Sequence, residues 1–397
     1  MKIKILVLTL AAATSAPAYA DIANIIVYGR AHISFDSNAG NAPANATTDS
    51  KDGLNLVSNV SNLGFKGEED LGDGLKAIFQ YETEIFAQGS SSLLGSQRNT
   101  FAGLKSEFGT LRAGRLPLAN QYVGDVNFLE DKVGDSGNLT TGGFAGLGLL
   151  YVPGRINRAL SYTSPTMAGT TLTLGFVPNT PQSMVTASSP QNSLGKDVSF
   201  TLRAAYENNG LFAAANYLSL GITGMSLAST PIAAAPSATA GTIAAPVSGQ
   251  AGAKLSVLSL AGGYDFGVAK VRAQYVSTDA NQAAAYSVGA GTGAKQVVFA
   301  LGGQYNITEK SALKIELVNA SDASLNGVTV ANTGANLLAL GYDYALSKRS
   351  TLYAAYAKVN NGAAAQFSAT GYGHSGVGSP GVAYSPSALS VGLILTF

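Results

Sequence analysis

Alternation of apolar and polar side chains along short segments is the feature that most constrains this chain. In residues 76–85, apolar residues such as Phe79 and polar residues such as Glu82 occupy opposite parities. A two-residue period places successive side chains on opposite faces of a β-strand. The same period recurs in sixteen segments, of which the first is 25–36 and the last is 387–397. The pattern therefore predicts an all-β fold of sixteen strands.

Short turns and long connections alternate between the predicted strands. The turn 69–74 is rich in Asp and Gly, which favour tight turns. The long connections are rich in Ala, Gly, Ser and Thr, a composition shared by solvated linkers and by loops displayed outside the cell. They include 38–52, 117–154, 223–252, 279–293, 321–334 and 360–386. An even number of strands, with short turns at one end and long loops at the other, is typical of a transmembrane β-barrel.

Charged residues on the polar faces distinguish a barrel from a packed sandwich. These residues are Arg30, Lys76, Glu82, Glu84, Arg203, Lys270, Arg272, Lys314 and Glu316. Burying so many charges in a protein core costs several kcal/mol each unless they are paired. A water-filled lumen avoids that cost, and lipid then contacts the apolar faces. We therefore predict a transmembrane antiparallel 16-stranded β-barrel, with an exported β-sandwich as the alternative that the pattern leaves open.

The last predicted strand shows what closure requires. Leu389 and Val391 share one parity, whereas Ser390 has the other. The barrel has no free edge only if this strand pairs with residues 25–36. We expect its apolar parity to face lipid and Phe397 to lie in the aromatic girdle at the membrane interface.

The first twenty residues have the features of an export signal. Two lysines precede the apolar stretch 5–13, and residues 18–20 fit a small-residue cleavage motif. We expect residues 1–20 to be a signal peptide and residues 21–397 to form a single barrel domain. No later stretch contains the ~18 apolar residues that a membrane-spanning helix needs.

Composition excludes several classes of functional site. The chain has no cysteine and two histidines, His32 and His374, which excludes disulfides, thiolate metal sites and a polyhistidine centre. A net charge of +1 gives no basis for nucleic-acid binding. Glu82 and Glu84 share a face, but carboxylates in a wet lumen lack the burial that a catalytic pair needs. We therefore expect no enzyme activity, no cofactor and no metal.

The long connection 117–154 is the best candidate to narrow the channel. A sixteen-stranded barrel leaves a lumen that wall side chains cannot fill. The connection contains eight glycines and the candidate constriction acids Asp125, Glu130 and Asp131. If it folds inward, these acids would face wall arginines, and the transverse field between them would orient passing dipoles. Asp135, in the same connection, equally fits a loop-stabilising role.

Four arginines form the predicted basic wall of the constriction. They are Arg30, Arg112, Arg115 and Arg155. Each of them is alternatively an ordinary solvated residue of the lumen or the rim. Arg112 and Arg115 have opposite parity, so both face the lumen only if the strand bulges near Gly114.

Several motifs carry a resemblance to a known family. They are YGR at 28–30, NLGFKGEEDLGDGLKA at 62–77 and FGTLRAGR at 108–115, and SYTSP at 161–165 and the final Phe397 fit as well. In these residues the chain resembles the general porins of Gram-negative outer membranes, and it looks closest to their beta-proteobacterial branch. The resemblance covers the predicted barrel from its first strand to its last.

The resemblance implies a homotrimer of sixteen-stranded barrels in the cell outer membrane, each with its third long loop folded into the pore. It implies a passive, water-filled channel for small hydrophilic solutes and ions, in contact with outer-membrane lipids and lipopolysaccharide. Arg30 matches a basic position of the pore eyelet, and Arg115 matches the Gly-Arg that ends the fifth strand. Asn62 stands where many relatives have arginine, which removes one lumen charge and leaves the degree of anion preference open. We expect mild anion selectivity, because the predicted wall has more arginines than the loop has matched acids. Phe397 would be the signal read by the barrel-assembly machinery.

Two other functions remain compatible with the same residues. A substrate-specific outer-membrane channel would select one class of solute with aromatic side chains or paired charges. A surface adhesin or phage receptor would use the long loops, and this role is compatible with a passive channel.

Overall fold

The computed structural model describes residues 24–40, 53–86, 94–118, 121–141, 154–178, 198–221, 254–281, 293–325, 327–370, 374 and 382–397. The predicted signal peptide and most of the long connections, such as 223–252, lie outside these residues. None of the helices in the described part of the chain is long and apolar enough to cross a membrane.

Antiparallel β-strands make up most of the described structure. The strands of the first half are β1 (Asn24–Ala39), β2 (Gly53–Ser58), β3 (Asn62–Gly72), β4 (Leu75–Ile85), β5 (Leu94–Ser106), β6 (Gly109–Leu116), β7 (Ile156–Thr163), β8 (Thr170–Val177) and β9 (Ser199–Asn208). Those of the second half are β10 (Leu211–Gly221), β11 (Lys254–Asp265), β12 (Ala269–Asn281), β13 (Ala294–Thr308), β14 (Ser311–Ala320), β15 (Ser324–Leu325), β16 (Val328–Thr329), β17 (Ala335–Ala345), β18 (Ser350–Asn361) and β19 (Ser387–Thr396). Between β6 and β7 lie two short helical turns, η1 (Val123–Asp125) and α1 (Gly137–Thr140).

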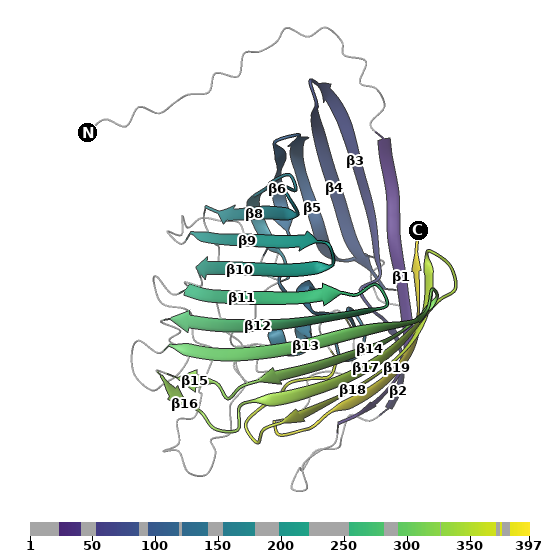
Figure 1. Ribbon diagram of the computed structural model, residues 1–397, viewed down its shortest axis with the longest axis vertical. Coiled ribbons are helices and arrows are strands. Elements are labelled where there is room, and N and C mark those ends of the chain that lie inside the picture. Colours follow the sequence, from purple (N-terminus) through teal and green to yellow (C-terminus); the bar gives the residue numbers. More distant parts are fainter. Residues whose placement is uncertain are drawn as a thin grey trace, which may run out of the picture.

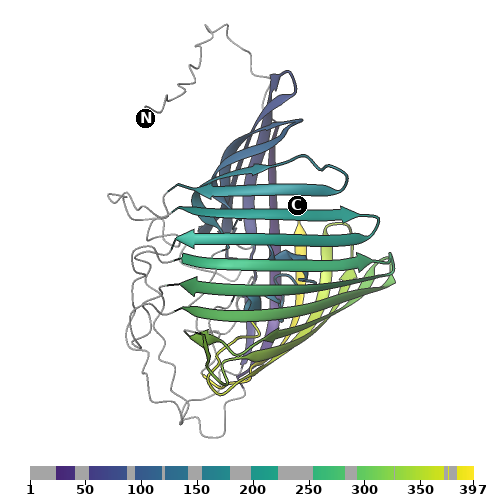
Figure 2. The same cartoon turned by 60° about the vertical axis from the view of Figure 1, so that its left-hand side comes forward.

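The strands close into a single ring, which Figure 1 and Figure 2 show from two directions. β2 and β3 both pair with β1 and together form one wall strand. β15 and β16 form a small hairpin within the connection 321–334. The wall therefore has sixteen antiparallel strands, which confirms the predicted barrel.

The pairing of β1 with β19 closes the wall, as the alternation predicted. Its register places Arg30 opposite Thr396. One step further, the main chains of Gly29 and Phe397 exchange two hydrogen bonds of 3.1 Å. A Cβ on Gly29 would lie 2.4 Å from the Phe397 ring, so glycine is needed for the ring to pack here.

The two faces of the wall differ in the predicted way. Phe35 and Val391, which have the outer parity, are 60% and 54% exposed. His32 and Ser390, which have the inner parity, are fully buried. The outer face therefore presents apolar side chains suited to lipid, while the inner face carries the polar ones.

The short turns lie at one end of the barrel, and the strand ends that lead into the long connections lie at the other. Between β9 and β10, Asn209 and Gly210 have φ angles of 50° and 80°. Two successive left-handed residues are typical of a type I′ turn, whose twist matches that of the two strands it joins. Local turn chemistry therefore accounts for this hairpin.

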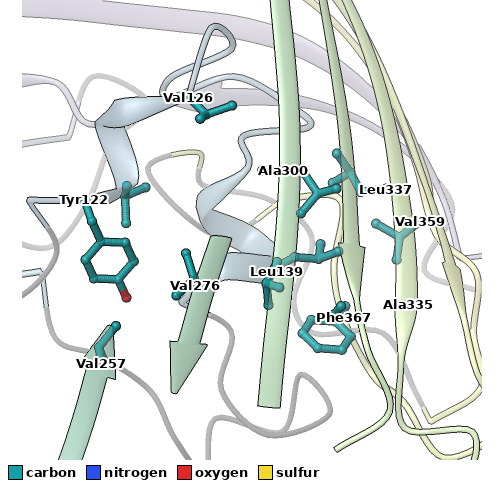
Figure 3. Close-up of a cluster of buried hydrophobic side chains, with 14 of the residues drawn as sticks. Tyr122, Val126, Leu139, Val257, Val276, Ala300, Ala335, Leu337, Val359 and Phe367 are labelled. Atoms are coloured by element: carbon teal, nitrogen blue, oxygen red, sulfur yellow. The ribbon is translucent and has the colours of Figure 1, made fainter. Parts of the chain in front are cut away.

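The main apolar cluster lies inside the ring, between the segment 121–141 and the wall (Figure 3). Tyr122 and Leu139 of the segment are almost completely buried. They belong to one cluster with Val276 and Leu337, which have the inner parity on β12 and β17. The described part of the long connection therefore folds inward, as expected.

Candidate functional site

Two salt bridges attach the inward segment to nearly opposite sides of the ring. Arg30 of β1 pairs with Asp131. Arg203 of β9 binds both carboxylate oxygens of Asp125, at 2.9 and 2.6 Å. Two of the three predicted acids, Asp125 and Asp131, therefore contact wall arginines. Of these two arginines, Arg30 belongs to the predicted basic wall and Arg203 does not.

Arg203 is a site residue that the sequence did not single out. Its partner Asp125 is 3% exposed and also accepts a hydrogen bond of 3.3 Å from Asn216. A carboxylate bound by both arms of a guanidinium is a strong and directional contact. The lumen parity of Arg203 could be read from its strand, but no spacing indicates which acid would reach it.

Lys132 makes a third ionic attachment. Its Nζ donates to Asp343 at 2.6 and 2.8 Å, and the same carboxylate accepts a hydrogen bond of 2.6 Å from Lys314. The Lys132 ammonium also lies 5.0 Å from the centre of the Tyr353 ring. Burial, together with repulsion by Lys314, lowers the pKa of Lys132 to about 8. This attachment could not be read from the sequence, because Lys132 and Asp343 are far apart along the chain.

Hydrogen bonds to backbone N–H groups hold residues 128–129, the tip of the segment, against the wall. Glu316 of β14 accepts hydrogen bonds from the backbone N–H groups of Phe128 and Leu129, the latter at 2.8 Å. A Cβ on Gly302 would lie 2.6 Å from the Phe128 ring, and a Cβ on Gly341 would lie 2.4 Å from the Leu129 side chain. These two wall glycines therefore allow the segment to approach closely.

The remaining acids of the segment have different surroundings. Asp135 is buried and accepts hydrogen bonds from the backbone N–H groups of Asp131 and Gly137, at 2.8 and 2.7 Å, and from Asn127 at 2.7 Å. Burial, assisted by the charge of Asp131, raises its pKa well above the ordinary value. Glu130 is exposed, but the surrounding protein and the charge of Asp131 raise its pKa too. Asp135 thus stabilises the loop, the second of the two roles considered for it.

A second group of charged side chains lies on the inner face of β3 to β5. Arg98 forms a 2.5 Å salt bridge with Glu82, and the Tyr28 hydroxyl donates to the same carboxylate at 2.8 Å. Glu82 is therefore neutralised by a wall arginine, which agrees with its predicted lumen face.

Arg112 and Lys66 are held mainly by aromatic rings. The Arg112 guanidinium lies 5.6 Å from the centre of the Phe101 ring and donates to Thr163 at 3.2 Å. The Lys66 ammonium lies 5.0 Å from the centre of the Tyr28 ring. Within the described residues, neither cation has a carboxylate within 4.0 Å. Cation–π contacts hold these groups without cancelling their charge.

The bulge that would have turned both Arg112 and Arg115 to the lumen is not in their own strand but in the neighbouring strand. The register between β6 and β7 shifts where Asn157 and Arg158 together face Arg115. Along β6 the alternation continues, so Arg115 stands opposite Thr100 and shares the parity of the exposed Leu111. Because the extra residue belongs to β7, Arg115 keeps the outward parity.

Arg115 and Arg155 both bond to neighbouring wall residues. Arg115 donates to the backbone oxygen of Gln97 at 2.8 Å and to Asn157 at 2.5 Å. Arg155, just before β7, donates to Asn99 at 2.8 Å. Of the four arginines of the predicted basic wall, Arg30 therefore contacts an acid of the loop, whereas the other three contact residues of the wall.

Comparison with known protein families and sequences gives a consistent result. The family model described as Gram-negative porin matches residues 7–364. The major outer membrane protein P.IB of Neisseria meningitidis serogroup B is 34% identical over 170 residues, which cover 43% of this chain and 47% of that protein. The chain thus spans about half the length of the curated relatives that it matches.

Two solved structures have a similar fold over nearly the whole chain. The anion-selective porin from Comamonas acidovorans has a TM-score of 0.69 at 21% identity, and the match covers 94% of this chain and 100% of that one. The outer membrane protein OmpT of Vibrio cholerae, in its trimer form, has a TM-score of 0.65 at 14% identity and coverages of 95% and 100%. At these identities the likeness concerns the fold alone.

Replacing Glu316 by alanine is expected to loosen the tip of the inward segment. A buried N–H group that loses its acceptor costs roughly 1–3 kcal/mol, so the Leu129 amide should exchange its hydrogen roughly 5- to 150-fold faster. Hydrogen-exchange mass spectrometry of the purified barrel measures this rate. Glu309→Ala, in the exposed turn after β13, is the matched control. Unchanged exchange at residues 128–129 in the Glu316 variant would show that this carboxylate does not hold the segment.

Proposed function

Because this chain belongs to the Gram-negative porin family, we propose that it forms a passive, water-filled channel in the outer membrane. The observation that carries the proposal is the closed ring of sixteen strands with an apolar outer face and a charged inner face. Lipid suits the first face and water the second, so small hydrophilic solutes and ions can cross by diffusion. The family assignment agrees with the expectation that the chain is not an enzyme.

The proposal includes a constriction formed by the connection 117–154. This part of the proposal is supported by the salt bridges of Asp125, Asp131 and Lys132, which hold the described part of the connection against the inner wall. Glu130 is exposed beside them and supplies a carboxylate to the lumen. Asp131 and Glu130 then form the acidic side of the constriction, while Asp125 serves as an anchor.

Mild anion selectivity is the proposed consequence of the wall charges. Arg112 and Lys66 keep their positive charge without a carboxylate within 4.0 Å among the described residues, whereas Glu82 and Asp131 are both paired with arginine. A net positive wall raises the local concentration of anions. The structural neighbour from Comamonas acidovorans, which is described as anion-selective, is in line with this sign.

The proposed assembly is a homotrimer surrounded by outer-membrane lipid and lipopolysaccharide. The supporting observations are the exposed apolar outer face and the similar barrel of Vibrio cholerae OmpT, which is described in a trimer form. Insertion by the barrel-assembly machinery is proposed to depend on Phe397, which is 54% exposed.

Planar-bilayer recording tests the channel directly. Addition of the purified protein to one side of a lipid bilayer should give stepwise increases of ion current, because each inserted assembly opens a fixed aqueous path. Heat-denatured protein is the control. Folded protein that inserts into the bilayer without any current step would contradict the proposal.

Two arginines on the same strand should affect selectivity differently. Arg112→Gln removes a lumen charge and should lower the chloride-to-potassium permeability ratio roughly twofold, the size expected for a unit charge several Å away in water. Arg115→Gln removes the same charge from the outward parity and should leave the ratio unchanged. Reversal potentials in a salt gradient measure both. An equal shift in the two variants would place Arg115 in the lumen.

Deletion of Phe397 should impair assembly more than conductance. The matched variant Gly29→Val keeps Phe397 in the sequence but removes the space beneath its ring, at an overpacking cost of roughly 1–3 kcal/mol. If Phe397 is an assembly signal, its deletion should lower the trimer yield in outer-membrane fractions severalfold, whereas Gly29→Val should mainly lower the urea midpoint of unfolding. A normal yield after the deletion would contradict the signal role.

A further inference from the structure

The connection between β18 and β19, residues 362–386, also folds into the barrel, and we call it the last connection. Its described residues are 362–370, 374 and 382–386. Phe367 and Ala369 are 1% and 2% exposed, and both belong to the apolar cluster inside the ring. Figure 3 shows Phe367 in the cluster that also contains Leu139 of the segment 121–141. A second inward element therefore packs with the first.

One asparagine gives the last connection its shape. Asn361, the final residue of β18, donates from Nδ2 to the backbone oxygens of Phe367 and Tyr384, at 2.8 and 2.7 Å. Its Oδ1 accepts a hydrogen bond of 3.0 Å from the backbone N–H of Phe367. These three bonds join the described parts 362–370 and 382–386. The local fold of the last connection therefore places the Phe367 ring inside the barrel.

A main-chain hydrogen bond joins the two inward elements. The N–H of Gly134 donates to the backbone oxygen of Ala369 at 2.9 Å. Gly134 has a φ of 83°, and a Cβ on it would lie 2.3 Å from the Ala339 side chain on β17. Only glycine combines this left-handed backbone with so close an approach to the wall. The last connection thus contacts the segment next to Asp131 and Lys132, which attach it to the wall.

His374 extends the last connection to the first strand of the ring. Its Nε2 lies 3.3 Å from a carboxylate oxygen of Asp36 on β1, and both side chains are fully buried. In the ring, β19 lies between β18 and β1. The last connection therefore contacts the wall on both sides of β19, through Asn361 on β18 and through Asp36 on β1.

Inner-parity residues differ in exposure between the two sides of the ring. On β11 to β18, inner residues toward the long connections are at most 5% exposed and belong to the apolar cluster. They include Val257, Val276, Val298, Val318, Leu337 and Val359. On β3 and β4, Lys66 is exposed, while Gln80 and Glu84 are half-buried. The two inward elements therefore cover one side of the lumen and leave the other side accessible.

We propose that the last connection positions the constriction, that Phe367 is its positioning residue, and that the two inward elements confine the solute path to the side of β3 to β6. An ion avoids the packed apolar side, because leaving water there without a partner costs several kcal/mol. Charges on β3 to β6, such as Arg112, then act on passing ions at close range. The inference rests on the proposed function, because it assumes that solutes cross the lumen.

Single introduced cysteines test the path, because the chain has none of its own. Gln80→Cys lies on the accessible side, whereas Thr278→Cys replaces an inner residue of β12 that is 7% exposed. A water-soluble, negatively charged thiol reagent should label Gln80→Cys and lower its chloride-to-potassium permeability ratio. Thr278→Cys should be labelled about tenfold more slowly, because labelling requires local opening. Mass spectrometry of the folded barrel measures both rates. Equal rates would overturn the confined path.

Removal of the Phe367 ring tests the positioning role. In the Thr278→Cys background, Phe367→Ala should raise the labelling rate about tenfold, because loss of a buried ring loosens the packing around it. The Gly134 amide should exchange its hydrogen faster by a similar factor, and each current step should become larger. Asn361→Ala should act in the same direction while keeping the ring in the chain.

A matched control separates this role from general destabilisation. Phe299→Ala removes the same ring from the outer parity of β13, where it is 53% exposed. It should leave the labelling of Thr278→Cys and the exchange of Gly134 unchanged. Wild-type values of both in Phe367→Ala and in Asn361→Ala would overturn the positioning role.

Failure of this inference and failure of the proposed function give different results, because labelling and hydrogen exchange need no ion current. Normal current steps with equal labelling of Gln80→Cys and Thr278→Cys would reject the confined path alone. Labelling that depends on Phe367 in a barrel without current steps would reject the channel, and with it any solute path, and leave Phe367 a packing role only.

Discussion

Satisfaction of backbone hydrogen bonds in the wall is the constraint on which the rest of this structure depends. A strand edge that faced lipid would leave N–H and C=O groups without partners, at a cost of several kcal/mol for each group. The pairing of β1 with β19 removes both edges of the sheet. Closure also determines which side chains face lipid and which face the lumen. Because Val391 faces outward, Ser390 must face inward, and the strand register imposes the same choice on every neighbouring strand.

Closure leaves an interior that wall side chains cannot fill, and the inward segment 121–141 occupies part of it. Polar wall groups under this segment lose water and are therefore paired, as Arg203 is with Asp125 and Asp343 is with Lys132. Removing one partner of a buried pair costs roughly 3–5 kcal/mol, because the other charge is left uncompensated. The same contacts that satisfy buried charges thus hold the segment at a defined position in the lumen, and the proposed constriction follows from the packing of the barrel.

Residues of the candidate site differ in how far the sequence could predict them. Arg30 and Asp131 were expected on opposing elements, and they are in contact. Lys132 and Glu316 were not singled out, because their contacts depend on the path of a segment that has no periodic pattern. The position of Arg115 depended on which of two paired strands carries an extra residue. Either strand can accommodate a bulge, so only the register could decide between them.

The sequence by itself determined the sheet, its strand number and its two faces, because a two-residue period leaves one way for apolar side chains to meet lipid while charges stay in water. It also indicated which connection folds inward, through length, glycine content and acids. The tertiary structure alone decided which wall residues hold that connection, and that Arg115 takes the outward parity. Contacts of this kind join residues far apart along the chain, and their geometry is set only when the ring closes and fixes the register of every strand.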